Sequence, residues 1–327
     1  MTGPAFLFGS GAAFSLATCS NWEAYSRWSG KVERRLLRLL AVALIGYMFH
    51  LTYFSLRRTL YEGTPDQLSS LLSMDVLQCI AISGLLLQVL VMLLPGERWF
   101  FRVAAASGMV IGLATPLVWS ASSRLPLWLG TAISGRFGSV FPLFPHLGFC
   151  MAGAAWGCWF VRSRRSAAED QFLLTSGRMS VWLIAGGLAA LVLPLQNVFG
   201  DFWATGLTYF FPRLGILALL LAVCRAAEDR LLPAVNMVVL LGSESLMAYT
   251  SHLIILYGSP LNPDRNLGKL LGSSNGVVSV ALVLLALTSA TIACCWAWKT
   301  ANRNYGWKVK GLRWSLAGYL VYSFVSG

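Results

Sequence analysis

Three histidines and three other ionisable residues lie within or at the ends of long apolar runs, where they suggest acid–base chemistry. A titratable group in hydrocarbon costs free energy, so each such residue is a candidate functional residue. Histidine exchanges a proton near neutral pH, and a nearby carboxylate can orient it. The set comprises His50, Asp75, His146, Arg213, Glu244 and His252, with Gln78 and Gln88 as neutral polar companions.

His252 is the leading candidate for the general base, and Glu244 lies eight residues earlier, roughly on the same helical face. His50 is a further candidate catalytic residue. Each of these residues also has an ordinary structural interpretation. His50 and His146 would then lie at headgroup level or bond a nearby carbonyl, and Asp75 would cap the helix that follows it.

The elements that must position these residues are membrane-spanning helices. The chain is 57% hydrophobic and 12% charged, with a mean hydropathy of +0.66, which excludes an ordinary soluble globule and a disordered chain. A run of about 20 apolar residues is long enough to cross a bilayer as a helix. We predict an all-α polytopic membrane protein, a single domain over 1–327, with ten helices at 4–19, 36–56, 74–95, 100–120, 143–161, 179–198, 207–224, 235–258, 275–298 and 312–326.

The basic residues predict the orientation of these helices. Of the 25 lysines and arginines, eighteen fall in one set of alternate loops and six in the other. Cytoplasmic loops are rich in Lys and Arg, so the loop around Arg34 and Arg35 is predicted to be cytoplasmic and the first helix to begin outside. The net charge of +12 then reflects topology, and a nucleic-acid partner is not expected.

Three basic clusters, at 34–35, 162–165 and 308–310, are also candidate sites for an anionic cosubstrate, because they would suit phosphate groups electrostatically. The arginines that we predict to bind the cosubstrate are Arg34, Arg35, Arg164 and Arg165. The orientation rule alone would also place these charges in the same loops. The seven cysteines show no CxxC spacing, so neither a metal site nor a disulfide framework is expected.

Four segments, in order along the chain, resemble the transmembrane acyltransferases related to heparan-alpha-glucosaminide N-acetyltransferase and their bacterial relatives. The first segment is GPAFLFGSG from Gly3, followed by a basic run at 33–40. The second is DVLQCIAIS from Asp75, and the third is FPLFPHLGF from Phe141. The fourth is SLMAYTSH from Ser245, similar to the family's Ser-Leu-x-x-Tyr-x-x-His.

The resemblance implies about eleven helices, one more than the ten predicted from this sequence. It also implies an acetyl group passed from cytoplasmic acetyl-CoA to a sugar amine or hydroxyl on the opposite side of the membrane. His252 would then act as base, and Gln78 or Tyr249 would donate hydrogen bonds. Gln78 would belong to the cosubstrate site, and Asp75, His146 and Tyr249 would line the acceptor site. The expected location is a bacterial cytoplasmic (inner) membrane, with the lipid bilayer and a carbohydrate acceptor as partners.

The chain departs from the family pattern at two points. Members of the family begin with a further helix, followed by a loop with the histidine usually assigned to catalysis, and this chain starts after that loop. His146 stands where the family usually has tryptophan. An inactive truncated remnant is therefore one alternative, and a multi-pass transporter or flippase is another, with Glu244 as its ion-binding carboxylate. Homo-oligomerisation is left open.

Overall fold

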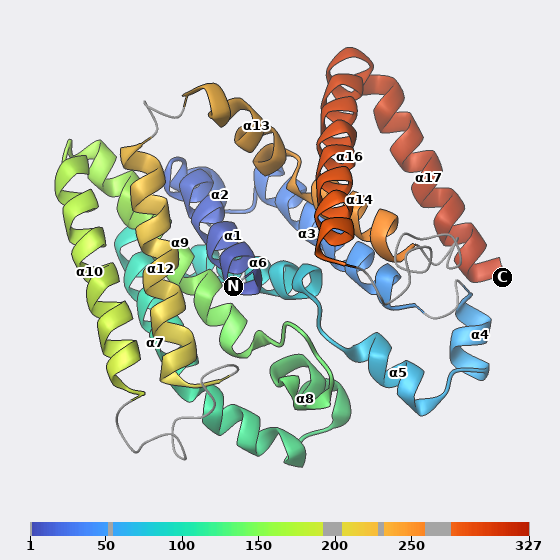
Figure 1. The fold of residues 1–327 in the computed structure, drawn as a ribbon, viewed down its shortest axis with the longest axis horizontal. Coiled ribbons are helices and arrows are strands. Elements are labelled where there is room, and N and C mark those ends of the chain that lie inside the picture. Colours follow the sequence, from blue (N-terminus) through green and yellow to red (C-terminus); the bar gives the residue numbers. More distant parts are fainter. Residues whose placement is uncertain (1, 52–54, 192–204, 228–231, 259–275, 327) are drawn as a thin grey trace. The chain divides into compact units, whose positions relative to one another are not determined.

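The computed structural model describes residues 2–51, 55–191, 205–227, 232–258 and 276–326, and within these ranges the regular structure is entirely helical (Figure 1). The chain divides into two compact units, which we describe separately. Unit 1 comprises residues 1–50 and 69–227, and unit 2 comprises 51–68 and 228–327. The prediction of a single domain over the whole chain stays a prediction.

Unit 1 is a bundle of long helices joined by short ones. Helices α1 and α9 pack along each other, as do α7 and α9, α10 and α12, and α3 and α6. Helix α9 has a kink at Phe144, and the peptide bond between Phe144 and Pro145 is cis. The elements are α1 (Thr2–Cys19), α2 (Trp22–Ser26), α3 (Gly30–His50), α6 (Val76–Leu93), α7 (Glu97–Ala121), η1 (Ser122–Arg124), α8 (Leu127–Ile133), η2 (Gly135–Phe137), α9 (Leu143–Arg165), α10 (Glu169–Ala189) and α12 (Leu207–Ala226).

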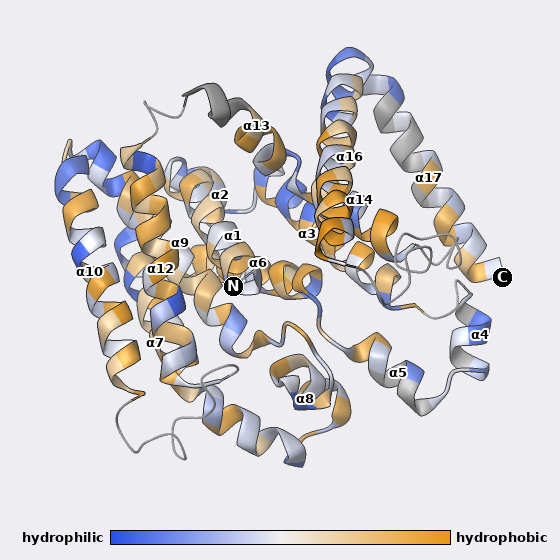
Figure 2. Cartoon of the chain, viewed as in Figure 1, coloured by the Kyte–Doolittle hydropathy of each residue, from blue (hydrophilic) through white to orange (hydrophobic). Residues whose placement is uncertain are grey.

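Unit 2 contains the C-terminal helices and one short helix from earlier in the chain. In it α14 packs against α16, and α16 and α17 form a hairpin. Figure 2 shows α16 as hydrophobic over most of its length. The elements are α4 (Leu56–Tyr61), α13 (Leu232–Ser243), α14 (Ser245–Tyr257), α16 (Val277–Asn304) and α17 (Gly306–Ser326), while α5 (Pro65–Leu72) crosses the boundary between the units.

The helices agree with the predicted all-α polytopic class, and each of the ten predicted segments contains a helix. Among the described residues, five helices are long and apolar enough to cross a membrane on their own, and a bent pair would make a sixth. The number of ten spans therefore stays a prediction. Residues 52–54, 192–198 and 275 of three predicted spans, together with Arg230, Arg265 and Lys269 of the charge count, lie outside the described residues.

The prediction of one straight helix over 235–258 is wrong. The chain bends by 85° between α13 and α14, and Glu244 at the bend has non-helical dihedral angles, φ −109° and ψ 32°. Glycine and serine are weak helix formers, and Gly242, Ser243 and Ser245 surround the bend. Glu244 and His252 therefore do not share the face of a single helix.

The two ends of unit 1 differ in chemistry. At one end, which we call the basic end, Arg165 of α9 donates hydrogen bonds to the Glu97 carboxylate of α7 and to the Cys19 carbonyl of α1. At the same end Arg225 of α12 pairs with Glu169 of α10 at 2.5 Å. Loops predicted to be cytoplasmic thus meet at the basic end, in agreement with the predicted alternation of the helices.

The opposite end, where α3 ends and α6 begins, we call the histidine end because it holds His50. Helix α6 joins the two ends and has 18 residues. At a rise of about 1.5 Å per residue it is about 27 Å long, close to the thickness of the hydrocarbon core. In the predicted orientation, the basic end is cytoplasmic and the histidine end is extracytoplasmic.

Glycines allow α1 and α9 to pack closely enough for their backbones to touch. A Cβ atom added to Gly153 would overlap the carbonyl oxygen of Phe8, and one added to Gly11 would overlap the carbonyl oxygen of Cys150. Close approach through small residues is the usual way in which helices associate in membranes, where burial of apolar surface gives little driving force.

We therefore expect Gly153→Ala to force α1 and α9 apart and to lower the free energy of unfolding by about 1–3 kcal/mol. Gly177→Ala in α10 is the matched control, because a Cβ added at Gly177 would meet no atom within 4 Å. That control should be neutral or gain about 0.5–1 kcal/mol, since glycine is a poor helix former. Unfolding in detergent followed by circular dichroism measures both, and equal stability of the two variants would contradict the close α1–α9 contact.

Candidate active site and cosubstrate groove

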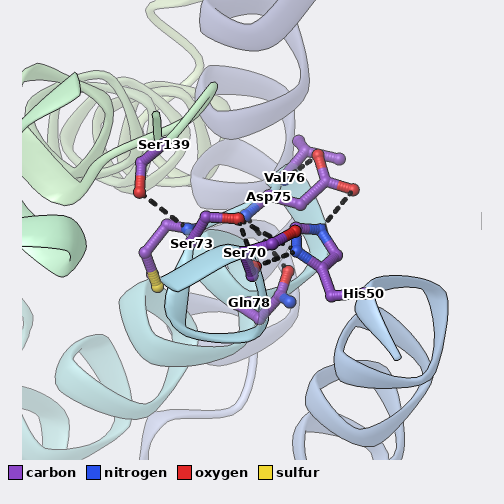
Figure 3. A network of polar contacts seen from close by, with 8 residues as sticks. His50, Ser70, Ser73, Asp75, Val76, Gln78 and Ser139 are labelled. Atoms are coloured by element: carbon purple, nitrogen blue, oxygen red, sulfur yellow. Dashed lines mark hydrogen bonds and ion pairs between the residues drawn. The ribbon is translucent and has the colours of Figure 1, made fainter. Parts of the chain in front are cut away.

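His50 and Asp75 face each other at the histidine end (Figure 3). His50 is the last residue of α3, Asp75 directly precedes α6, and the distance from His50 Nε2 to Asp75 Oδ2 is 4.0 Å. Their side chains are 18% and 19% exposed, so a small polar group can reach both. The structure thus brings together one predicted catalytic residue and one predicted acceptor-binding residue.

Asp75 is held in place because it caps α6. Its Oδ1 accepts a hydrogen bond of 2.7 Å from the Val76 N–H, and the Gln78 side chain accepts one of 3.2 Å from the Asp75 N–H. The pair forms a capping box. The interpretation of Asp75 as a helix cap is therefore confirmed, and the capping role leaves Oδ2 directed toward His50.

The turn between α5 and α6 determines which nitrogen of His50 faces Asp75. His50 Nδ1 lies 3.0 Å from the Ser70 carbonyl oxygen and 3.0 Å from the Ser73 hydroxyl, which itself donates to the Ser70 carbonyl at 2.7 Å. Both neighbours act as acceptors, so this network assigns the proton of a neutral imidazole to Nδ1. Nε2 then presents its lone pair on the side of Asp75, as a general base requires.

Hydrogen bonds from the segment that precedes α9 hold the residues just before α6 in place. The Met74 N–H donates to the Ser139 hydroxyl at 2.8 Å, and this hydroxyl donates to the Thr131 carbonyl at 2.6 Å. The Phe141 N–H donates to the Met74 carbonyl at 3.1 Å. Figure 3 shows that Ser139 belongs to a segment separate from the one that holds the rest of the network. None of these serines was a predicted site residue, because isolated serines in loops carry no pattern.

Gln78 lies beside the pair, one turn into α6, and packs closely on Gly46 of α3. It is buried, and its Nε2 has no hydrogen-bond partner among the described residues. A buried amide donor without a partner costs free energy, so such a group often awaits a ligand or a water molecule. Gln78 is distant from the basic end, so any contact with a cosubstrate would be with its acyl part.

His146 occupies an ordinary core environment. It is buried, its Nδ1 lies 2.8 Å from the Pro142 carbonyl oxygen, and its ring meets that of Phe141 edge-on at 5.4 Å. This agrees with the structural interpretation of His146. Its predicted role in acceptor binding stays a prediction.

The predicted site residues Glu244, Tyr249 and His252 lie in unit 2. His252 Nδ1 is 3.0 Å from the Ala248 carbonyl oxygen of its own helix, and its ring meets Tyr249 edge-on at 5.2 Å. Glu244 lies at the α13–α14 bend, where its carbonyl is 3.9 Å from Cys295 Sγ. A broken helix with a carboxylate at the break is a feature of transporters, and this is the one observation that favours that alternative.

A groove of about 1220 Å³ opens at the basic end, between the start of α7, the end of α9 and the start of α10. Arginine side chains pack near aromatic rings in it: the Arg102 guanidinium is 5.5 Å from the Trp99 ring, and that of Arg162 is 6.0 Å from the Phe101 ring. Cations and flat rings together suit a ligand with phosphates and an aromatic base. Its cationic lining residues are Arg98, Arg102, Arg162 and Arg165, with Glu97 as the acidic one.

Of the four arginines predicted to bind the cosubstrate, only Arg165 lines this groove. Arg164 is exposed and pairs with Glu169 at 3.9 Å, and Arg34 bonds a carbonyl of its own helix. Arg35 instead donates hydrogen bonds of 2.9 Å to Thr18 and Gln88 in the bundle. The arginines missed from the sequence had a usable signal, because Arg98 and Arg102 are four residues apart at the start of a helix.

No group of three or more His, Cys, Asp or Glu side chains among the described residues is placed to hold a metal ion.

A comparison with protein families finds the model for heparan-alpha-glucosaminide N-acetyltransferase, catalytic, over residues 1–192. The match covers more than half of the 327 residues, and the chain belongs to this family of membrane acetyltransferases. The matched residues include the His50–Asp75 pair and the groove, whereas Glu244, Tyr249 and His252 lie outside them. Neither the curated proteins nor the solved structures include a match to this chain.

Two substitutions of Asp75 separate its structural role from its charge. Asp75→Ala removes the cap and should lower the free energy of unfolding by about 1 kcal/mol, whereas Asp75→Asn keeps a side-chain oxygen and should cost only a few tenths. Both lose the negative charge beside His50. Thermal unfolding in detergent compares them, and equal losses in the two variants would show that the cap contributes little.

Proposed function

We propose that the protein transfers an acetyl group from acetyl-CoA at the basic end to a sugar amine or hydroxyl at the histidine end. The observation that carries this proposal is the position of the two sites at opposite ends of α6, both within the residues that match the family. In the predicted orientation the donor comes from the cytoplasm and the acceptor is extracytoplasmic. The proposed location is a bacterial cytoplasmic membrane.

The residues of the groove fit the nucleotide part of acetyl-CoA, which supplies an acetyl group activated as a thioester. Arg98, Arg102 and Arg162 would bind the phosphates through charge-assisted hydrogen bonds. Arg165 is held by two hydrogen bonds of 2.9 Å to Glu97, so it would be oriented before any ligand arrives. Trp99 and Trp159 line the same groove and offer faces on which a base can stack.

His50 would serve as the general base. Its Nε2 lone pair and Asp75 Oδ2 can both accept a hydrogen bond, and they lie 4.0 Å apart. The amine N–H or hydroxyl O–H of the sugar can therefore donate a hydrogen bond to either atom. His50 takes this proton as the acceptor nitrogen or oxygen bonds to the acetyl carbon and the carbon–sulfur bond breaks. Asp75 then stabilises the imidazolium of His50, and the imidazolium can pass its proton to the departing thiolate of CoA. The Gln78 amide is a candidate donor to the oxyanion.

His252 is the second candidate for the base. Its Nδ1 faces a helix carbonyl at 3.0 Å, which likewise assigns the proton to Nδ1 and leaves Nε2 as the basic nitrogen. Tyr249 would be its hydrogen-bonding neighbour in the acceptor site, and Glu244 would be a separate catalytic carboxylate at the bend before α14. We favour His50 because His252 has no carboxylate opposite its ring in the described contacts.

Replacement of two groove arginines should weaken binding of CoA. We expect the Arg98→Gln/Arg102→Gln variant to raise the dissociation constant of CoA by about 100-fold or more, because two charge-assisted hydrogen bonds of about 1.5–3 kcal/mol each would be lost. Arg178→Gln is the control, since Arg178 is exposed on α10 and does not line the groove. Titration calorimetry in detergent gives both constants, and unchanged affinity in the double variant would remove CoA from this groove.

His50→Gln should lower the rate of acetyl transfer by about 100-fold or more, the usual contribution of a general base. Binding of CoA should not change, because His50 lies at the other end of α6. The assay is release of the free CoA thiol from acetyl-CoA with glucosamine as the acceptor probe, run beside His252→Gln. Full activity in His50→Gln together with loss in His252→Gln would transfer the role of base to His252.

A further inference from the structure

The segment that joins α7 to α9 at the histidine end has its polarity reversed. Four of its five hydroxyl side chains are buried and Ser123 is exposed, whereas four of its large apolar side chains face outward. Leu125, Leu127, Trp128 and Val140 are 37%, 47%, 61% and 70% exposed. The buried hydroxyls belong to Ser122, Thr131, Ser134 and Ser139.

The segment satisfies these hydroxyls from its own or adjoining backbone. Ser122 donates to the Trp119 carbonyl at 2.7 Å, Thr131 to the Leu127 carbonyl at 2.9 Å, and Ser139 to the Thr131 carbonyl at 2.6 Å. The Ser134 hydroxyl accepts from the Arg136 N–H at 3.2 Å. These buried hydroxyls therefore need no water as a partner, which is what contact with hydrocarbon requires.

The main chain of the segment is paired in the same way. Short helices α8 and η2 and the turn η1 account for much of residues 122–137. The Leu125 N–H donates to the Ser122 carbonyl at 3.2 Å, and the Gly130 N–H donates to the Pro126 carbonyl at 2.9 Å. The Ser134 N–H donates to the Gly130 carbonyl at 3.0 Å. Several backbone N–H groups of the segment are thus paired within it.

We propose that the 122–140 segment inserts its apolar side chains into the extracytoplasmic leaflet of the membrane. The occupant of this surface is lipid, because α7 is a membrane-spanning candidate and the segment continues directly from its end. Tryptophan is enriched at the level of the lipid headgroups. Arg124 and Arg136 are exposed on the same segment, and their positive charges complement the negative charges of lipid phosphates.

The insertion would also set the depth of the His50–Asp75 pair. Ser139 belongs to the inserted segment and accepts the hydrogen bond from the Met74 N–H at 2.8 Å, one residue before Asp75. The segment therefore links the lipid surface to the residues that begin α6. This inference goes beyond the proposed acetyl transfer and does not depend on it.

Site-directed spin labelling of the full chain tests the proposal. The probe is a nitroxide on Trp128→Cys, in lipid nanodiscs of phosphatidylethanolamine and phosphatidylglycerol, with the exposed Cys224 replaced by alanine. The measurement is the collision rate with oxygen, which concentrates in lipid, relative to that with a water-soluble nickel chelate. Val110→Cys, exposed on α7, is the lipid reference, and Arg164→Cys, exposed at the basic end, is the water reference.

We expect the oxygen-to-nickel ratio at Trp128 to lie well above that at Arg164 and to approach that at Val110. A ratio equal to that at Arg164 would overturn the proposal, because the segment would then lie in water. Low access to both reagents with dipolar broadening between labels would also overturn it, because a second copy of the chain would then cover the surface. Val140→Cys repeats the measurement if Trp128→Cys does not fold.

Discussion

The capping box at the start of α6 is the interaction on which the candidate chemistry depends. The orphan N–H groups of a helix that begins near the membrane surface need an acceptor, and Asp75 supplies it with one carboxylate oxygen. The second oxygen is thereby fixed on the side of His50, 4.0 Å from Nε2. A local requirement of helix formation thus places a negative charge beside a histidine, and the Ser70–Ser73 turn directs the basic nitrogen toward it.

The length of α6 then determines how far the acid–base pair lies from the arginine groove. Eighteen residues of helix separate the two, and the backbone contacts of Gly11 and Gly153 hold α1 against α9 in the same bundle. Glu97 and Arg165 join α7 to α9 at the basic end at 2.9 Å. The arrangement suits a reaction whose donor and acceptor reach the protein from opposite faces of a membrane, as proposed for acetyl transfer.

The helices could be predicted from the sequence because hydrocarbon admits only long apolar segments with internally paired backbones. The same constraint made it possible to predict that Asp75 caps a helix and that the basic loops lie at one end of the bundle. The partners of His50 could not be predicted, since Ser70 and Ser73 lie in a polar turn without periodicity. The bend at Glu244 was missed because an apolar run gives the same sequence pattern whether the helix is continuous or broken. The groove was missed because three helix ends create it, and the stretches that line it, 95–102 and 159–175, are distant in sequence.

Sealed membrane vesicles of known orientation test most directly whether the two ends of unit 1 serve opposite faces of the membrane. The vesicles would hold glucosamine inside and receive labelled acetyl-CoA outside. The account predicts labelled glucosamine inside vesicles whose cytoplasmic face is outward, and none when the opposite face is outward. Labelled product formed only when acetyl-CoA and glucosamine share one face would contradict transfer across the membrane.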